Sequence, residues 1–268
     1  MRLIQPRLVL ILFFLTIWTM RSSAQESFHK LSLGTGWAGS TLKDKVISSY
    51  IYKKNGIPIL LEYNYKGYHS FMGVRVYMLF NKLKTDENKG FAYKGDLGNF
   101  VPDKINGLTH SQVSCFTFQT RGYVLGRIYM DDRLSLGIGG FVQYDHVHKR
   151  FLVLSYENKL KEGFFSIGPQ LMPVYISGPH EFQFALSASL LTVGARKLAP
   201  DEGSTTRVSG TSFLKEYMGV ESRLTYSYSI SQTIGVDFNY IFYYYQYSKP
   251  RKEQMAIQNL TAGLSFMF

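Results

Sequence analysis

Polar and apolar residues alternate along the eleven residues Gln258-Asn259-Leu260-Thr261-Ala262-Gly263-Leu264-Ser265-Phe266-Met267-Phe268. Every second residue counted back from Phe268 is apolar, and the residues between them are mostly small or polar. Successive side chains of a β-strand point to opposite faces. The pattern therefore predicts a strand whose apolar face carries Leu260, Leu264, Phe266 and Phe268.

An aromatic last residue behind alternating apolar positions resembles the closing strand of outer-membrane β-barrels of Gram-negative bacteria. The resemblance identifies no subfamily. It implies an all-β protein, a closed antiparallel transmembrane β-barrel in the cell outer membrane. It also implies contact with outer-membrane lipid and lipopolysaccharide, and with the barrel-assembly machinery through the C-terminal strand.

Residues 1–24 are predicted to be a signal peptide. Two arginines precede the apolar run 8–20, and Ser22-Ser23-Ala24 offers the small residues of a cleavage site. The run is shorter than the roughly 20 apolar residues that a spanning helix needs. We therefore expect Sec-type export and one mature barrel domain, residues 25–268. The single cysteine, Cys115, excludes an internal disulfide.

The mature chain is basic. Removal of residues 1–24 takes away three arginines and no acidic residue, so 27 of the 30 Lys and Arg remain against 19 Asp and Glu, a net charge of +8. In an exported protein this balance favours anionic lipid headgroups over nucleic acid as partners. No later stretch is apolar enough for a spanning helix, so a membrane location requires a closed barrel.

Ten alternating segments predict about ten strands. They are residues 28–37, 57–66, 69–82, 111–129, 133–147, 163–177, 181–197, 213–230, 233–248 and 254–268. Short connections alternate with longer ones, as in barrels with short periplasmic turns and longer outer loops. Pro169 and Pro173 interrupt the sixth segment. Residues 151–156 could extend a hairpin above the membrane or hide a further strand pair. Eight and twelve strands therefore stay open.

Each segment has two chemically different faces. Between residues 233 and 248, Ile234, Val236 and Phe238 begin an apolar face, and Asp237 and Asn239 lie on the other. Lysine gathers in the longer connections. A soluble, lipocalin-like barrel, the alternative, would place aliphatic residues inside and charged residues outside. We expect the reverse, with the apolar face in lipid and the polar face around a narrow lumen.

Charged residues on the polar faces predict an ion-pair network in the lumen. They are Glu62, Arg75, Arg121, Arg127, Asp145, Glu221, Arg223 and Asp237. A buried unpaired charge is costly, so mixed signs on neighbouring strands imply pairing. The network would plug the barrel or, alternatively, line a selective passage.

The stretch Asp145-His146-Val147-His148 ends its strand at the expected outer rim. Omptin proteases, also ten-stranded, keep an Asp/His site at the outer mouth, and the chain resembles them in strand count and in this cluster. The resemblance implies that Asp145 with His146 or His148 could activate water. No second acidic pair, serine partner or third metal ligand can be named. We therefore assign no catalytic residue, no metal and no cofactor.

Aromatic residues near strand ends predict girdles at the membrane–water interface, where the ring lies among headgroups and the hydroxyl reaches water. They are Tyr63, Tyr65, Tyr226, Tyr228, Tyr240, Phe242 and Tyr244. Basic residues of the longer connections could touch the phosphates of lipid A. They are Lys43, Lys45, Lys53, Lys54, Lys149, Arg150, Lys159 and Lys161.

These observations favour a monomeric, non-enzymatic outer-membrane barrel with a structural, adhesive or narrow-passage (porin-like) role. One alternative is an outer-leaflet hydrolase, an omptin-like protease or a lipid A-modifying enzyme, acting through the rim Asp/His site. Another is a subunit of a larger export or uptake complex. The sequence specifies neither a substrate nor a protein partner.

Overall fold

The computed structural model describes residues 28–44, 51–85, 112–153, 156–200, 206–213, 216–248 and 252–268. Their strands are β1 (Phe28–Asp44), β2 (Ile51–Lys66), β3 (Ser70–Thr85), β4 (Gln112–Met130), β5 (Leu134–Val153), β6 (Tyr156–Ser177), β7 (His180–Ala188), β8 (Leu191–Pro200), β9 (Thr206–Phe213), β10 (Tyr217–Ser229), β11 (Ile234–Tyr247) and β12 (Glu253–Met267). In these ranges no helix is long and apolar enough to cross a membrane. The signal peptide predicted for residues 1–24 lies outside them.

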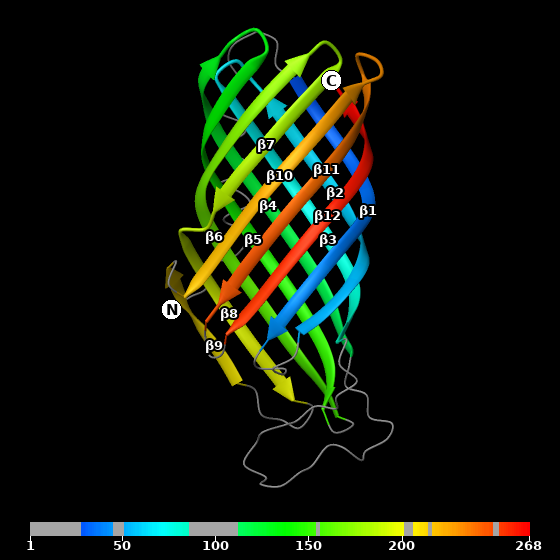
Figure 1. The fold of residues 1–268 in the computed structure, drawn as a ribbon. Coiled ribbons are helices and arrows are strands. Elements are labelled where there is room, and N and C mark those ends of the chain that lie inside the picture. Colours follow the sequence, from blue (N-terminus) through cyan, green and yellow to red (C-terminus); the bar gives the residue numbers. More distant parts are fainter. Residues whose placement is uncertain are drawn as a thin grey trace.

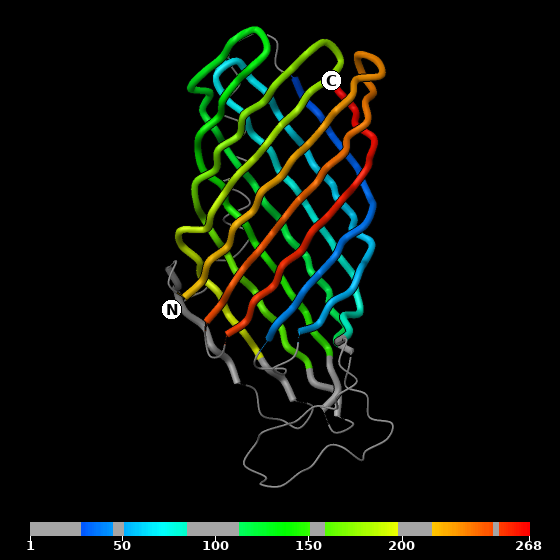
Figure 2. The backbone as a smooth tube through the Cα atoms, viewed as in Figure 1, coloured from blue at the N-terminus to red at the C-terminus, as the bar shows by residue number. Residues whose placement is uncertain are grey.

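The strands close into one antiparallel barrel (Figures 1 and 2). Each strand from β1 to β7 pairs with the next, β7 pairs with β10, and β12 returns to β1. β8 continues β7 along the flank of β6, and β9 pairs with β8 before the chain enters β10. The wall therefore has ten strand positions, two of them broken. This confirms the expected barrel and its strand count.

The short turns and the C-terminus lie at one end of the barrel (Figure 1). We call this the short-turn end, and call the opposite end the outer end, following the arrangement of bacterial barrels. At the short-turn end, His29 and Phe268 exchange two backbone hydrogen bonds of 3.1 and 3.0 Å. These two bonds extend the pairing of β1 and β12 to Phe268.

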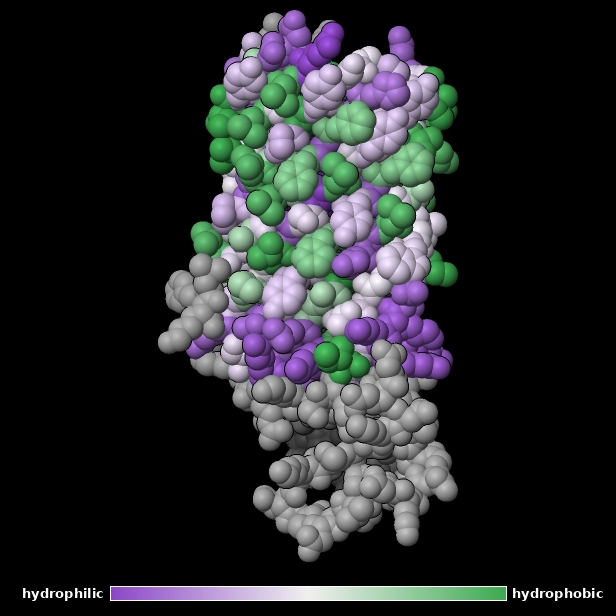
Figure 3. All heavy atoms as spheres, in the orientation of Figure 1, coloured by the Kyte–Doolittle hydropathy of each residue, from purple (hydrophilic) through white to green (hydrophobic). Residues whose placement is uncertain are grey.

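The wall separates two environments. Outward side chains at the middle of the strands are apolar and exposed, such as Leu33 (57%), Phe238 (46%) and Leu264 (54%). Inward residues of the same strands are polar and buried, such as Arg75 and Asp237. Figure 3 shows one face of this apolar belt, with hydrophilic side chains toward both ends. The apolar faces therefore point outward, as the sequence predicted.

The strands continue beyond the belt, and there the polarity reverses. We call this part the outer extension (residues 39–44, 51–56, 81–85, 112–115, 146–153, 156–162, 196–200 and 252–258). Its outward side chains include Lys82, Lys161 and Lys197, which are exposed. Its inward side chains include the almost completely buried Leu42, Tyr52, Leu83, Val113, Leu160 and Met255. The extension is built like a water-soluble barrel.

Much of this extension falls in the predicted connections, and there the prediction is wrong. For residues 151–156, the extended hairpin, one of the two predicted alternatives, is confirmed. Residues 38–44, 51–56 and 148–153 are strand, and β5 and β6 pair without interruption from Leu134↔Tyr175 to Val153↔Tyr156. No further strand pair lies in the described part of that hairpin. Strands were predicted from an apolar outward face. The extension carries lysines on that face, so much of it was predicted to be loops.

The two prolines of β6 lie where its pairing with β7 is incomplete. The register passes from Ile167↔Leu191 to Gln170↔Ser187, so one extra residue is accommodated opposite Gly168 and Pro169. A Cβ on Gly168 would lie 2.0 Å from the carbonyl oxygen of Ala188. Pro169 therefore falls at a bulge, where a ladder bond is not required, and Pro173 falls in a gap of the β6–β7 pairing.

A charged side chain on the apolar belt should destabilise the barrel most at the middle of the belt and least at its edges. We expect Phe238→Arg to lower the free energy of unfolding in lipid vesicles by about 2–4 kcal/mol. Gln258→Arg, beyond the belt on β12, should cost less than about 1 kcal/mol. Guanidinium unfolding titrations measure both. Equal costs at the two positions would contradict the placement of the belt.

Candidate functional site

Charged side chains inside the belt form one connected network. Arg75 binds Glu221 with both terminal nitrogens, at 2.9 and 2.5 Å, and Arg121 approaches the same carboxylate at 3.4 Å. Arg223 pairs with Glu62. All five side chains are almost completely buried. Strands β2, β3, β4 and β10 are thus tied together across the lumen.

Amides extend this network to the surrounding wall. Gln119 accepts from Arg75 at 2.8 Å and donates to Asp145 at 2.9 Å. Arg121 donates to Gln143 at 3.0 Å and to Gln170 at 2.9 Å, with its guanidinium 3.8 Å from the ring centre of Phe141. A cross-section this crowded leaves few polar atoms unpaired.

The other two predicted lumen charges lie apart from this network. Asp237 binds Lys30 and Ser32, each at 2.6 Å. The Arg127 guanidinium lies 4.2 Å from the ring centre of Phe71 and is only partly buried. The structure therefore brings Glu62, Arg75, Arg121, Glu221 and Arg223 together, and gives Asp237 and Arg127 separate partners.

The structure does not assemble the Asp/His pair at the rim. Asp145 points into the lumen, where it accepts hydrogen bonds from Gln119, Gln143 and Tyr243. His146 and His148 lie on the outer face of the same strand. Residues separated by one or three positions in a strand point to opposite faces. The wall therefore separates the carboxylate from both imidazoles, and they cannot act as a base and its orienting partner.

A second charged cluster lies inside the outer extension. Lys149 binds Asp44 at 3.1 Å and Glu162 at 2.8 Å, and also pairs with Glu253. Arg196 contacts the same three carboxylates, at 2.5 Å for Asp44 and Glu162 and 2.9 Å for Glu253. We call these five residues the outer cluster. Strands β1, β5, β6, β8 and β12 each supply one member.

The sequence analysis missed the outer cluster. Lys149 was expected among the basic loop residues that touch lipid A phosphates, but its side chain is 0% exposed. The residues next to it could have revealed its position. Val147 points inward, so Lys149, two residues later in the same strand, points inward as well, and Arg150 points outward. Lys45, from the same prediction, lies outside the described residues.

Three carboxylates and two cations leave the outer cluster one negative charge in excess. Burial raises the pKa of Glu253, and the neighbouring Glu162 raises it further. Burial also opposes ionisation of Glu162, but Lys149 and Arg196 outweigh it, so the pKa of Glu162 lies below its ordinary value. Glu253 is therefore the member that holds a proton most readily.

The outer cluster is a poor metal site despite its geometry. Carboxylate oxygens of Asp44, Glu162 and Glu253 lie within 4.8 Å of one another, which would suit a divalent cation. Lys149 and Arg196 already contact all three carboxylates. A metal ion would have to displace both buried cations.

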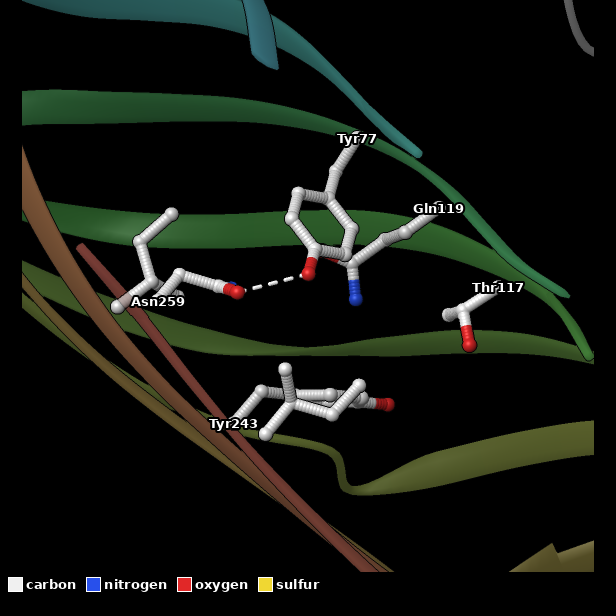
Figure 4. Close-up of a pocket in the computed structure, with 7 residues that line it drawn as sticks. Tyr77, Thr117, Gln119, Tyr243 and Asn259 are labelled. Atoms are coloured by element: carbon white, nitrogen blue, oxygen red, sulfur yellow. Dashed lines mark hydrogen bonds between the residues drawn. The ribbon is translucent and has the colours of Figure 1, made fainter. Parts of the chain in front are cut away.

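An aromatic layer fills the lumen beside the outer cluster. Phe164 lies 5.3 Å from Tyr217 and 5.1 Å from Tyr247 between ring centres, and Tyr245 donates a 2.6 Å hydrogen bond to Glu253. A cavity of about 10 Å³ lies nearby, lined by Tyr77, Thr117, Gln119, Ile241, Tyr243, Ile257 and Asn259. Figure 4 shows its polar lining, with Tyr77 hydrogen-bonded to Asn259. It has room for about one water molecule.

The predicted interface aromatics all lie on the outer face. Tyr63 and Tyr65 are at the short-turn end with His29, which binds the Tyr63 hydroxyl at 2.7 Å. Tyr226 and Tyr228 lie at the same end beside His180. Tyr240 is in the middle of the belt, and Phe242 and Tyr244 approach the outer extension. Leu260, Leu264, Phe266 and Phe268 of the last strand are exposed on the belt.

Solved structures of outer membrane proteins resemble this barrel. The protease OmpT from Escherichia coli has a TM-score of 0.58 at 10% identity, covering 93% of this chain and 100% of that chain. Ail of Yersinia pestis has a TM-score of 0.35 at 13% identity over 90% of this chain and 99% of its own. Neisserial surface protein A has 0.37 at 12% over 91% and 100%. The similarity to OmpT shows a shared fold and nothing more. The other two TM-scores are too low to show even that.

The sequence matches no protein-family model and no curated protein sequence.

Removing one cation from the outer cluster should cost far more than removing one from the surface. We expect Lys149→Met to lower the free energy of unfolding by about 3–5 kcal/mol, because three carboxylates would share a single arginine. Lys82→Met, exposed on the same extension, should change it by less than about 0.5 kcal/mol. Denaturant titration in detergent micelles compares them. Similar losses would argue against a buried ion pair.

The two glutamates of the outer cluster should respond oppositely to neutralisation. Glu162, with a lowered pKa, stabilises the fold above its unfolded pKa, and this stabilisation is lost as pH falls through the folded value. Glu253, with a raised pKa, contributes stability at low pH that is lost as pH rises through its folded value. At pH 7, Glu162→Gln should therefore destabilise the barrel, and Glu253→Gln should not. Unfolding midpoints from pH 3 to 8 test this; equal losses would contradict it.

Proposed function

We propose that the protein is an outer-membrane barrel with a sealed lumen, which serves as a rigid, non-enzymatic support. The observation that carries the proposal is the filled interior. In the described part of the lumen, the Arg75–Glu221 network, the aromatic layer and the outer cluster follow one another. The cavity between the network and the aromatic layer holds about one water molecule. Solutes have no continuous water column to follow.

The membrane location rests on the outer wall. The belt is apolar where a lipid-facing barrel must be, and tyrosine and histidine side chains lie at its short-turn end. The leader-like residues 1–24 support export, and the exposed apolar face of β12 suits recognition by barrel-assembly machinery. The fold shared with an outer membrane protease agrees with this location.

Two features support a structural or adhesive role: the interior is filled, and the outer wall and both ends of the barrel remain for contacts with other molecules. Asp145 is separated from His146 and His148 by the wall, which removes the support for a hydrolase acting through them. A sealed interior leaves the outer wall and the two ends as the surfaces through which the protein acts. The outer extension raises one of these ends above the belt on regular strands.

Conductance measurements test the seal. We expect the purified barrel to give no discrete conductance steps in a planar bilayer and no sugar-driven swelling of liposomes. Emptying the belt layer with Arg75→Gly, Arg121→Gly and Arg223→Gly should still give no steps, since the aromatic layer blocks the lumen in series. Steps from the unmodified barrel would overturn the proposal. Circular dichroism and heat-modifiable gel mobility confirm folding of each sample.

A further inference from the structure

A row of basic side chains crosses three strands just above the belt. Lys161 on β6 is paired in register with His148 on β5 and with Lys197 on β8. All three side chains point outward, and both lysines are exposed. Side chains directly opposite one another in neighbouring strands have Cβ atoms about 4.5–5.5 Å apart. Lys161 and Lys197 are therefore held as a like-charge pair.

The three strands that carry the row add no negative charge to it where their side chains are described. The outward faces of β5, β6 and β8 carry no acidic residue where side chains are described. Like charges directly opposite in a sheet are destabilising. Burial lowers the pKa of His148, and Arg150 and Lys161 lower it further. Its Nε2 is buried without a hydrogen-bond partner in the described structure. The row is arranged to receive an anion.

Below the two lysines of the row, the outer wall carries small and apolar side chains. Two residues nearer the belt, Gly163 and Ala195 are paired in register, and the Tyr144 ring lies over Gly163, with its hydroxyl 3.5 Å from where a Cβ would be. Two residues further, Tyr144, Phe165 and Val193 are exposed by 42, 37 and 48%. Each two-residue step advances about 7 Å along a strand. Two such steps, about 14 Å along the strand, separate the row from this apolar surface.

We propose that His148, Lys161 and Lys197 bind the phosphate group of an anionic glycolipid in the outer leaflet. The phosphate lies between the two ammonium groups, the sugar packs on the Tyr144 ring beside Ala195, and the acyl chains run along Phe165 and Val193. The inference rests on the proposed membrane location and deepens it by naming a lipid class and a site. A soluble anion would gain nothing from the apolar surface below the row.

The test measures binding of diphosphoryl lipid A to the full-length mature barrel in neutral detergent by native mass spectrometry. We expect Lys161→Gln/Lys197→Gln to weaken binding about 30-fold, the effect of two basic side chains near a phosphate-bearing surface. The matched control, Lys82→Gln/Lys84→Gln, removes two exposed lysines from β3 and should bind as the unmodified barrel does. Dephosphorylated lipid A should bind weakly to all three proteins.

Equal affinity of the first variant and the unmodified barrel would overturn the proposal, as would equal binding of dephosphorylated lipid. Competition by millimolar inorganic phosphate would also overturn it, in favour of a free-phosphate site. A second measurement needs no variant: the pKa of His148, followed by NMR, should rise when diphosphoryl lipid A is added, and an unchanged pKa would count against the site. A barrel that fails to enter lipid vesicles would instead refute the membrane location.

Discussion

Neutralisation of charge inside a narrow wall is the constraint on which this barrel depends. Lipid-facing strands must turn their polar residues inward, and ten strands leave too little room for those residues to stay hydrated separately. Each charge therefore finds a partner on another strand. Arg75 with Glu221, Arg223 with Glu62, and Lys30 with Asp237 join strands that are distant in sequence. These pairs fix the cross-section and, by the same contacts, fill it.

The outer extension follows a different rule with the same backbone. Once a strand leaves the apolar belt, water replaces lipid on its outer face, and the favourable arrangement of side chains inverts. Leu42, Leu83 and Leu160 then fill the interior while lysines cover the outside. The outer cluster is enclosed in this second, apolar core. One chain thus contains a membrane-type interior and a soluble-type interior, stacked end to end.

Sequence periodicity was sufficient for the barrel but not for the site. The alternation at Ile234, Val236 and Phe238 identified both the strand and its outward face. In the belt apolar residues recur at every second position, and this series points outward. The same pattern failed for Lys149 and Glu162. Where β5 and β6 leave the belt, the outward residues become polar, so the pattern no longer shows which side chains point inward. It also misled at Asp145 and His146, since neighbours in sequence are separated by the wall. Which charges meet across the lumen depends on closure and register, which no single strand encodes.

The pairing of β1 with β12, from Lys30↔Met267 to Asp44↔Glu253, has a consequence for the order of assembly. This seam joins the two most distant strands in the sequence, so it closes the longest loop of the barrel. Most contacts of the seam are of the highest possible sequence separation, which makes closure slow and entropically demanding. A partly synthesised chain has two open edges and no way to satisfy them. Closure of this wall is therefore an event that follows completion of the chain.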